Sequence, residues 1–274
     1  MSVTYTATLP VREETARFLT GLLEAERARR GTRADSRALS CAEQAVLVLR
    51  WFVDGTRLRQ LATDNAIGRS TAYDYLHEGI DLLAARAPTL QAALLAAKIA
   101  GHRHISVDGT LIETDRRRTP GPTPGVDLWW SGKHHNHGGN IQVITAPDGW
   151  PVWTSEVRPG REHDTTALRA HGEVRPALAA WTGEDLPVLG DLGYEGDQDT
   201  ITVAFKKPKG GQLTADQRSH NKTHNGKRAV GERGNSLLKI TFKALRNVSL
   251  CPWRIGKIVA AALVLLHIEY NRTT

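Results

Sequence analysis

Three carboxylates stand where acidic side chains could do chemistry, and two of them are aspartates that follow short apolar runs. Asp108 lies in ISVDGT and Asp191 in VLGDLGY. Each is expected at the carboxyl end of a strand, which is where open α/β sheets bind their ligands. Neighbouring strand ends would let both carboxylates share divalent cations, which prefer oxygen ligands. Turn formation is the alternative, because Asp-Gly and Asp-Leu-Gly favour turns.

Glu232 is the third carboxylate, in GKRAVGERGNSLLK. On a helix, Arg228 precedes it by four residues and Lys239 follows it by seven, so the three charges share one stripe. A carboxylate flanked by two cations suits a site that holds a metal and grips phosphates. For Glu232 alone, an ordinary ion pair on an exposed helix is the alternative.

Charge is distributed unevenly along the 274 residues, whose formal net charge is +7. Residues 101–200 hold 9 basic and 15 acidic residues, whereas residues 201–274 hold 14 basic and 3 acidic residues. A basic surface attracts polyanions, so nucleic acid is the leading partner. Carboxylates would repel a phosphate backbone unless divalent cations lay between them, so the acidic middle favours a metal-dependent nuclease. Solvated surface charge is the alternative.

The composition, 40% hydrophobic and 24% charged, is that of an ordinary globular protein and excludes collagen-like, coiled-coil and disordered chains. Cys41 and Cys251 lie too far apart for a disulfide framework or a thiolate zinc site, which indicates a reducing compartment. The longest apolar run, at 258–266, is too short for a membrane span, and the first residues lack a signal-peptide pattern. We therefore expect a cytoplasmic protein without membrane contact.

The first hundred residues are predicted to be helical, because Leu, Ala and Arg dominate them. Ser40 and Glu43 form a predicted capping box that opens a helix, and Gly55 ends it. The apolar face expected on this helix comprises Ala45, Val46, Leu49, Phe52 and Val53.

A helix-turn-helix is predicted within residues 40–85, with helices at about 58–65 and from Ser70 onward. The apolar face of the last helix would comprise Ala72, Leu76, Ile80 and Leu83. Its outward residues have the types with which recognition helices reach phosphates and base edges: Arg69, Ser70, Thr71, Tyr73 and His77. A helical bundle with a polar outer face is the alternative.

From residue 101 the pattern predicts an α/β domain, residues 101–274, with a mixed sheet flanked by helices. Strands are expected in HISVDGTLI, in a hairpin turning at Pro147-Asp148-Gly149, in LPVLGDLGY and in ITVAFKKP. One helix is expected across HDTTALRAHGEVRPALAAW with Asp164 as its N-cap, and residues 210–226 are expected to be a loop. This domain would follow the all-α region of residues 1–100.

Together these residues resemble the DDE transposases of bacterial insertion sequences. The similarity lies in the contexts of Asp108 and Asp191, in Arg-x3-Glu-x6-Lys around Glu232, and in SGKHHNHGGNIQVITAPDGWPVWTSEVRPGREHD with its Pro-Gly-x-x-His-Asp ending. The nearest group is the fifth insertion-sequence family with its eukaryotic Harbinger-type relatives, over about residues 40–270. One position departs from the pattern, because a tyrosine that this group often carries before the arginine falls on Asn225.

The resemblance implies an RNase-H-like fold in which Asp108, Asp191 and Glu232 hold two Mg²⁺ or Mn²⁺ ions. Arg228 and Lys239 would hold phosphates near the active site. A DNA transposase is therefore expected, which cleaves at insertion-sequence ends and transfers the strand into target DNA. Its partners would be double-stranded DNA, as terminal inverted repeats and target, and further copies of itself on paired ends.

Weaker candidates surround this centre. His163 and the basic residues Lys206, Lys207 and Lys209 are expected to contact phosphates or DNA backbone. Trp129 and Trp130 could stack on frayed bases or pack in the core. No zinc site is expected at His134, His135 and His137, which lack a carboxylate or cysteine at ligand spacing.

Two alternatives stay open. An RNase-H-like nuclease without strand transfer would cut DNA but never join it. A transposase-derived DNA-binding protein without catalysis would keep its function when any of the three carboxylates is replaced.

Overall fold

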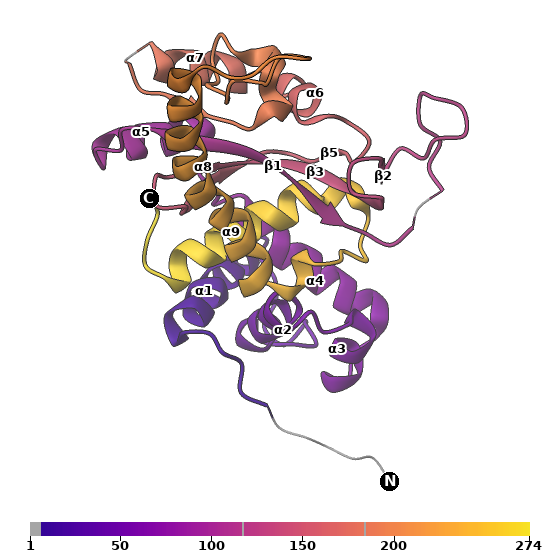
Figure 1. Ribbon diagram of the computed structural model, residues 1–274. Helices are drawn as coiled ribbons and strands as arrows, with labels where there is room; N and C mark the ends of the chain where they lie inside the picture. The colour runs from indigo at the N-terminus through magenta and orange to yellow at the C-terminus, as the bar shows by residue number, and fades with distance from the viewer. Residues whose placement is uncertain (1–6, 117, 184) are drawn as a thin grey trace.

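The computed structural model describes residues 7–116, 118–183 and 185–274. Figure 1 shows one group of helices below a mixed sheet, other helices above it, and the long helix α8 (Ala215–Thr241) crossing in front of the strands. The lower group consists of α1 (Glu13–Arg29), α2 (Cys41–Asp54), α3 (Leu58–Asp64), α4 (Arg69–Ala84) and α9 (Ile255–Glu269).

The three helices predicted between residues 40 and 85 are present. The Ser40 side chain accepts a hydrogen bond from the Glu43 backbone and the Glu43 side chain accepts one from the Ser40 backbone, so the capping box is confirmed. Gly55 ends α2 with a φ of 66°. The predicted apolar face of α4 is entirely buried: Ala72, Leu76, Ile80 and Leu83. Val46 was wrongly placed on the buried face of α2, because its side chain points away from the stripe of Ala45, Leu49 and Phe52 and is 45% exposed.

The last helix, α9, completes this helical group by packing on α4 and α1. The Thr15 hydroxyl donates a hydrogen bond to the Glu269 carboxylate at 2.5 Å. On α4, the Asp81 carboxylate accepts from Arg254 at 2.9 Å and from Lys257 at 3.0 Å. A boundary near residue 100 stays a prediction, and this helical core draws on both ends of the chain. Within the described ranges, no helix is long and apolar enough to span a membrane.

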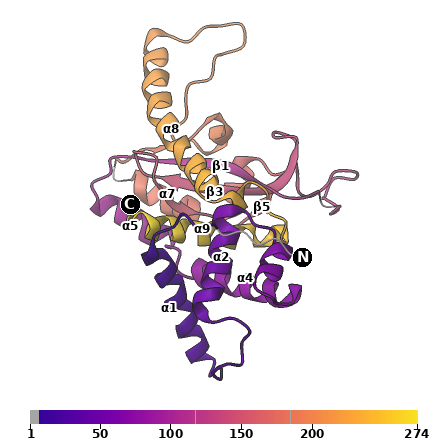
Figure 2. The same ribbon diagram turned by 90° about the horizontal axis from the view of Figure 1, so that it is seen from below.

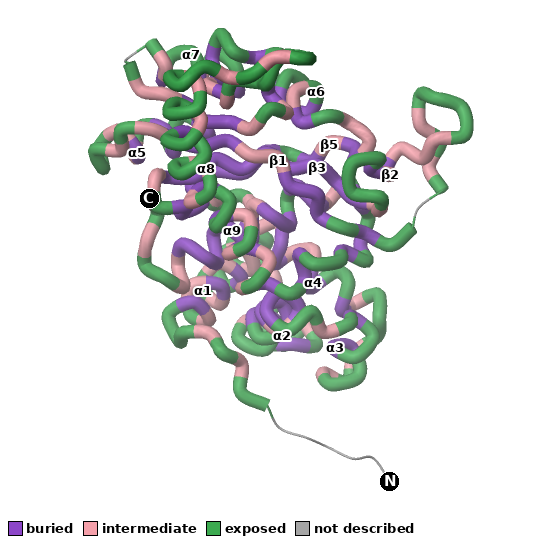
Figure 3. The backbone as a smooth tube through the Cα atoms, viewed as in Figure 1, coloured by how far each residue is buried: buried purple, intermediate pink, exposed green. Residues whose placement is uncertain are grey.

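The mixed sheet is built around β1 (Ile105–Glu113) and β3 (Asn136–Thr145), which run antiparallel with Asp108 opposite Val143. β6 (Val188–Leu189) lies parallel to β1 on its other side, with Ile105 opposite Val188. Three short strands pair with β3: β2 (Trp130–Ser131), β4 (Pro151–Thr154) and β5 (Arg158–Pro159). Figure 3 shows that β1 and β3 are buried over most of their length.

The remaining elements lie around the sheet and the lower helical group. They are the helices α5 (Leu90–Ile99), α6 (Asp164–Arg169) and α7 (Val174–Thr182), and the 3-10 turns η1 (Leu192–Asp197), η2 (Lys243–Leu245) and η3 (Pro252–Arg254). The predicted hairpin is confirmed, since β3 and β4 flank a turn in which Gly149 has a φ of 85°.

Three sequence-based expectations about secondary structure were wrong. ITVAFKKP forms only an isolated bridge between Leu189 and Thr202, so no regular strand follows β6 there. The stretch 210–226, expected as a loop, becomes helical at Ala215, where Thr214 and Gln217 form a capping box. The single helix expected after residue 163 is two helices, α6 and α7, separated by a turn around 170–173.

Two glycines let α8 lie against the sheet. A Cβ added at Gly231 would be 2.8 Å from Ser106 Cβ and 3.0 Å from Thr145 Oγ1, and one added at Gly234 would be 2.5 Å from Thr145 Cγ2. Figure 2 shows that the first half of α8, in contrast, projects away from the body of the protein. The glycines in the second half therefore set the distance between α8 and β1.

We expect Gly231→Ala to destabilise the protein by about 1–3 kcal/mol, because the added methyl group overlaps β1 and forces α8 outward. Gly226→Ala is the matched control on the same helix, since nothing lies within 4 Å of the added Cβ. It should stabilise the protein by up to about 1 kcal/mol through helix propensity. Urea unfolding of both variants measures the difference, and equal effects would contradict the close contact.

Candidate active site

The two aspartates are brought together by the parallel pairing of β1 and β6. Asp191 caps η1, and its Oδ1 accepts a hydrogen bond from the Gly193 backbone at 2.8 Å. Asp108 was expected at a strand end but lies in the middle of β1, because Gly109 continues the strand opposite Gln142 instead of turning. Pairing with β3 therefore holds the Asp108 backbone in the sheet, while β6 pairs with β1 just before it, at Ile105 and Ser106.

The second half of α8 lies over Asp108. The Asn235 amide donates to Asp108 Oδ2 at 2.8 Å, and a guanidinium nitrogen of Arg228 lies 3.9 Å from Asp108 Oδ1. Arg228 also donates a hydrogen bond to Glu232, whose side chain is 51% exposed. The predicted stripe thus brings Arg228 and Glu232 to Asp108. Asn235 was missed, although it lies on the same stripe, three residues after Glu232.

Lys239 continues this stripe but contacts the sheet. Its ammonium group donates to the Leu111 carbonyl oxygen at 2.9 Å. Burial lowers the pKa of Lys239, and the charges of Glu113 and Asp108 oppose that effect. In this structure Lys239 is therefore bound to the backbone of β1, three residues beyond Asp108.

Burial, together with the charges around it, changes the acidity of Asp108. Burial raises the pKa of Asp108 to about 6, and the nearby Arg228 guanidinium opposes the rise. The negative charges of Asp191, Asp164 and Glu232 add to it, in that order. A cation close to Asp108 therefore favours its ionised form.

Asp164 is a fourth carboxylate, predicted from its sequence position to be a helix N-cap. That assignment was wrong, because His163 is the N-cap of α6 and Asp164 is its first helical residue, 6% exposed. Its two oxygens accept hydrogen bonds from Lys133 Nζ at 3.0 Å and from Asn140 Nδ2 at 2.9 Å. The missed residues Lys133 and Asn140 are distant in sequence, so only the fold brings them to Asp164.

Asp164 lies against β1 on the face opposite to Asp108. A Cβ added at Gly109 would overlap Asp164 Oδ1, and side chains of consecutive strand residues point to opposite faces. A Cβ added at Gly193 would be 3.3 Å from Asp164 Oδ2. Asp164 thus packs beneath the two segments that carry Asp108 and Asp191.

A chain of buried polar groups extends from Asp164 to the turn after Asp191. Asn140 Oδ1 accepts from Gln142 Nε2 at 2.9 Å, and Gln142 Oε1 accepts from the Tyr194 hydroxyl. Burial raises the pKa of Tyr194 well above its ordinary value, so the hydroxyl stays a donor. Polar residues at alternate positions of β3, where a buried strand favours apolar ones, are the sequence signal that could have revealed this chain.

The residues predicted to contact phosphates or DNA are mostly exposed or line a cavity. His163, Lys133 and Asp164 line a cavity of about 340 Å³. Lys206 pairs with Glu195 at 2.9 Å. Lys207 and Lys209 are exposed, as is Asn225 on α8. On α4, Arg69, Ser70 and Tyr73 are exposed, and Thr71 and His77 are half-buried.

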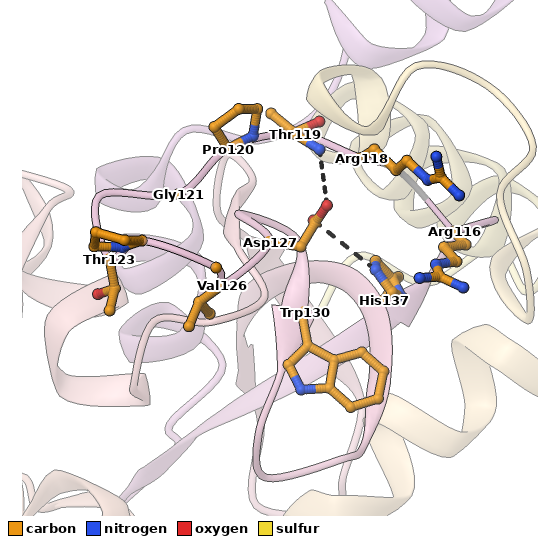
Figure 4. Close-up of a pocket in the computed structure, with 12 residues that line it drawn as sticks. Arg116, Arg118, Thr119, Pro120, Gly121, Thr123, Val126, Asp127, Trp130 and His137 are labelled. Atoms are coloured by element: carbon orange, nitrogen blue, oxygen red, sulfur yellow. Dashed lines mark hydrogen bonds and ion pairs between the residues drawn. The ribbon is translucent and has the colours of Figure 1, made fainter.

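The two adjacent tryptophans lie in different environments, and stacking on bases stays a prediction for Trp130. Trp129 is buried and packs edge-on against Trp253 with ring centroids 4.8 Å apart. Trp130 borders a hollow of about 950 Å³ together with Arg116, Arg118 and His137. Figure 4 shows this hollow, in which Asp127 accepts a hydrogen bond from the Thr119 backbone at 2.7 Å and lies 3.9 Å from His137.

Carboxylate oxygens suit divalent cations such as Mg²⁺ and Mn²⁺. In the described part of the chain, however, no three His, Cys, Asp or Glu side chains lie close enough together to hold one. Arg228 separates Asp108 from Glu232 in this arrangement. The carboxylates suit such an ion by their chemistry. The backbone already holds Asp108 and Asp191 side by side, whereas Glu232 is paired with Arg228.

Residues 107–267, more than half of the chain, match the family model described as DDE superfamily endonuclease. The chain belongs to the DDE superfamily endonucleases. The matched residues begin in β1 just before Asp108 and include Asp191 and the whole of α8. No curated protein matches this endonuclease.

Solved structures similar to this DDE endonuclease include the Mos1 mariner paired-end complex with Mn, at 12% identity and a TM-score of 0.21 over 95% of this chain and 96% of that one. A pre-cleavage Mos1 transpososome matches at 12% identity and a TM-score of 0.22, over 100% of this chain and 82% of that one. Similarity at this level does not establish a shared fold.

In metal-free solution we expect Asp108→Asn to stabilise this endonuclease at pH 7.5 by up to about 3 kcal/mol, the equivalent of a pKa raised from 3.8 to about 6. The unfolded carboxyl group ionises near pH 4 and the folded one near pH 6, so ionisation of Asp108 costs stability as the pH rises through this window. The gain should therefore disappear below about pH 4. Urea unfolding in EDTA at both pH values tests this.

Asp74→Asn, on the exposed face of α4, controls for the loss of one negative charge. A stability difference for Asp108→Asn that is the same at both pH values would contradict the raised pKa. A large destabilisation at pH 7.5 would show instead that the charged carboxylate is needed to hold Arg228 and Asn235.

Proposed function

We propose that this DDE endonuclease is a DNA transposase, which cleaves phosphodiester bonds at the ends of an insertion sequence and joins the released strand to target DNA. Family membership supports the nuclease step. The observation that carries the proposal is the meeting of Asp108 and Asp191, from adjacent parallel strands, with Arg228 and Glu232 from α8. Strand transfer rests on the sequence resemblance to insertion-sequence transposases.

Asp108, Asp191 and Glu232 would hold two divalent cations, Mg²⁺ or Mn²⁺. When bound, such ions lower the pKa of an attacking water or 3′-hydroxyl group and neutralise the leaving oxygen. β1, buried between its neighbours, fixes the position of Asp108, while the exposed Glu232 side chain is free to change partner. Hydrolysis and strand transfer would use the same carboxylates with different nucleophiles.

Arg228 has two roles in this proposal. Without DNA it balances Asp108 and Glu232. A guanidinium can also bind a phosphate through two parallel hydrogen bonds, so Arg228 would turn to the substrate when cations neutralise the carboxylates. His163 and Lys133, which line the same cavity, and the exposed Lys206, Lys207 and Lys209 would contact more distant phosphates.

The helices α2–α4 would bind the terminal inverted repeats as a helix-turn-helix. In such motifs the residues at the start of the recognition helix contact base edges. Arg69, Ser70 and Tyr73 lie exposed in the first turns of α4, with Thr71 and His77 partly covered beside them. Binding two ends at once would need a homo-oligomer on paired ends, which is part of the same proposal.

Nicking of supercoiled plasmid by the purified protein in Mg²⁺ or Mn²⁺ tests the catalytic assignment. We expect nicking to require the metal and to fall below detection in Asp191→Asn and in Glu232→Gln, because each variant removes an anionic oxygen ligand. Ca²⁺ serves as the metal control. The matched variants Asp199→Asn and Glu173→Gln, exposed carboxylates outside the site, should nick at the wild-type rate.

The products separate the proposal from its alternatives. Joining of a labelled 3′ end to plasmid DNA supports transposition, whereas metal-dependent nicking without joining leaves a nuclease. Nicking that persists in both site variants comes from a contaminant and removes the catalytic assignment. Specific DNA binding without any nicking would identify a DNA-binding protein that has lost catalysis.

A further inference from the structure

A groove of about 690 Å³ separates the start of α3 and α4 from the chain that follows α8. Five cations line it and define what we call the basic groove: Arg57, Arg59, Arg69, Lys243 and Arg246. They come from the connection before α3, from α3, from the start of α4 and from the segment at η2. Segments nearly 190 residues apart in sequence therefore contribute charge to one surface.

These cations have little compensation within the protein. All five side chains are exposed, and across the described ranges no carboxylate lies within ion-pair distance of any of them. Arg246 donates to the Lys239 carbonyl oxygen at 3.1 Å. Two acidic residues, Asp54 and Asp115, also line the groove, and Asp115 already accepts from Asn247 at 2.9 Å. The groove thus keeps a positive excess that a polyanion would neutralise.

The walls of the groove are fixed to each other. Phe52 of α2 packs edge-on against Phe242, just before η2, with ring centroids 6.0 Å apart. Gly55, in a left-handed conformation, lies so close to Lys243 that an added Cβ would be 3.3 Å from Lys243 Cβ. The cations on the two walls therefore form one preorganised surface.

We propose that the basic groove binds the phosphate backbone of double-stranded DNA and guides it between α4 and the carboxylates. This inference rests on the proposed function. Its lining includes both Arg69, in the first turn of α4, and Asp115, two residues beyond β1. Asp115 follows Asp108 by seven residues, at most about 24 Å of extended chain. At 3.4 Å per base pair, about seven base pairs span that distance.

The lining favours DNA over a protein partner. Protein interfaces have apolar, often aromatic anchors at their centre. Here Trp51 and Leu58 are buried, and Tyr73, 37% exposed, is the aromatic side chain that the groove offers. Exposed guanidinium and ammonium groups are instead the usual contacts to DNA phosphates.

The salt dependence of DNA binding tests the proposal. Anisotropy of a labelled 30-base-pair duplex, titrated with full-length protein in EDTA at several NaCl concentrations, gives the slope of log affinity against log salt. Each lost phosphate contact should lower this slope by about one. We expect a decrease of about two for the double variant Arg57→Gln/Lys243→Gln, because both side chains are exposed and neither lies within ion-pair distance of a carboxylate among the described residues.

Arg33→Gln/Arg86→Gln is the matched control, because it removes two exposed cations outside the groove. Its slope should stay at the wild-type value. Equal slopes for the two double variants, or a wild-type protein that does not bind the duplex, would overturn the proposal. A groove variant that loses affinity for polyglutamate but not for the duplex would assign the groove to an acidic protein and would overturn it as well.

The groove and the catalytic assignment can fail separately. EDTA prevents metal-dependent cleavage, so the slope reports binding alone. Suppose that the salt slope falls by about two in Arg57→Gln/Lys243→Gln while nicking survives Asp191→Asn. That result would keep the groove and remove the catalytic assignment. Unchanged slopes together with nicking that depends on Asp191 would do the reverse.

Discussion

Mutual repulsion of carboxylates is the constraint around which this structure is arranged. Asp108 has Asp191 beside it and Glu232 above it, and Asp164 lies beneath the same strand. Two cations keep this group of negative charges together, Arg228 on the side of α8 and Lys133 on the side of α6. Since Arg228 lies on α8 and Lys133 in the turn between β2 and β3, the packing of both faces of the sheet depends on this balance.

The two faces accommodate the carboxylates differently. On one face, Gly231 and Gly234 bring the backbone of α8 close enough for Arg228 and Asn235 to reach Asp108. On the other, both oxygens of Asp164 accept a hydrogen bond, and Asn140 continues this contact into the buried chain that ends at Tyr194. A satisfied polar chain of this kind is rigid, because each member would be costly to bury alone. The exposed face can thus exchange partners while the buried face holds the backbone in place.

The sequence was most informative where the signal was local. The capping box of Ser40 and Glu43 and the hairpin at Gly149 followed from neighbouring residues alone, and the periodicity of Arg228 and Glu232 placed them on one stripe. Asp108 was placed at a strand end because Asp-Gly favours turns, but pairing with β3 overrides that preference.

Long-range contacts account for the remaining errors. The role of Asp164 could not be found locally, since its partners Lys133 and Asn140 lie 31 and 24 residues away. The start of α8 looked like a loop because its glycine, asparagine and histidine residues are weak helix formers, and only the cap at Thr214 marks it. The groove cations Arg57 and Lys243 carry no local signal at all, because the fold alone brings them together.

The position of α9 has a consequence for how the protein is made. The helix is formed by residues 255–269, yet it covers the apolar side of α4, which is synthesised nearly 200 residues earlier. Contacts so distant in sequence form late and slowly. A nascent chain must therefore carry its first helices with this face uncovered until α9 has left the ribosome. Any product that ends before α9 leaves the face open to solvent, where it favours aggregation over activity.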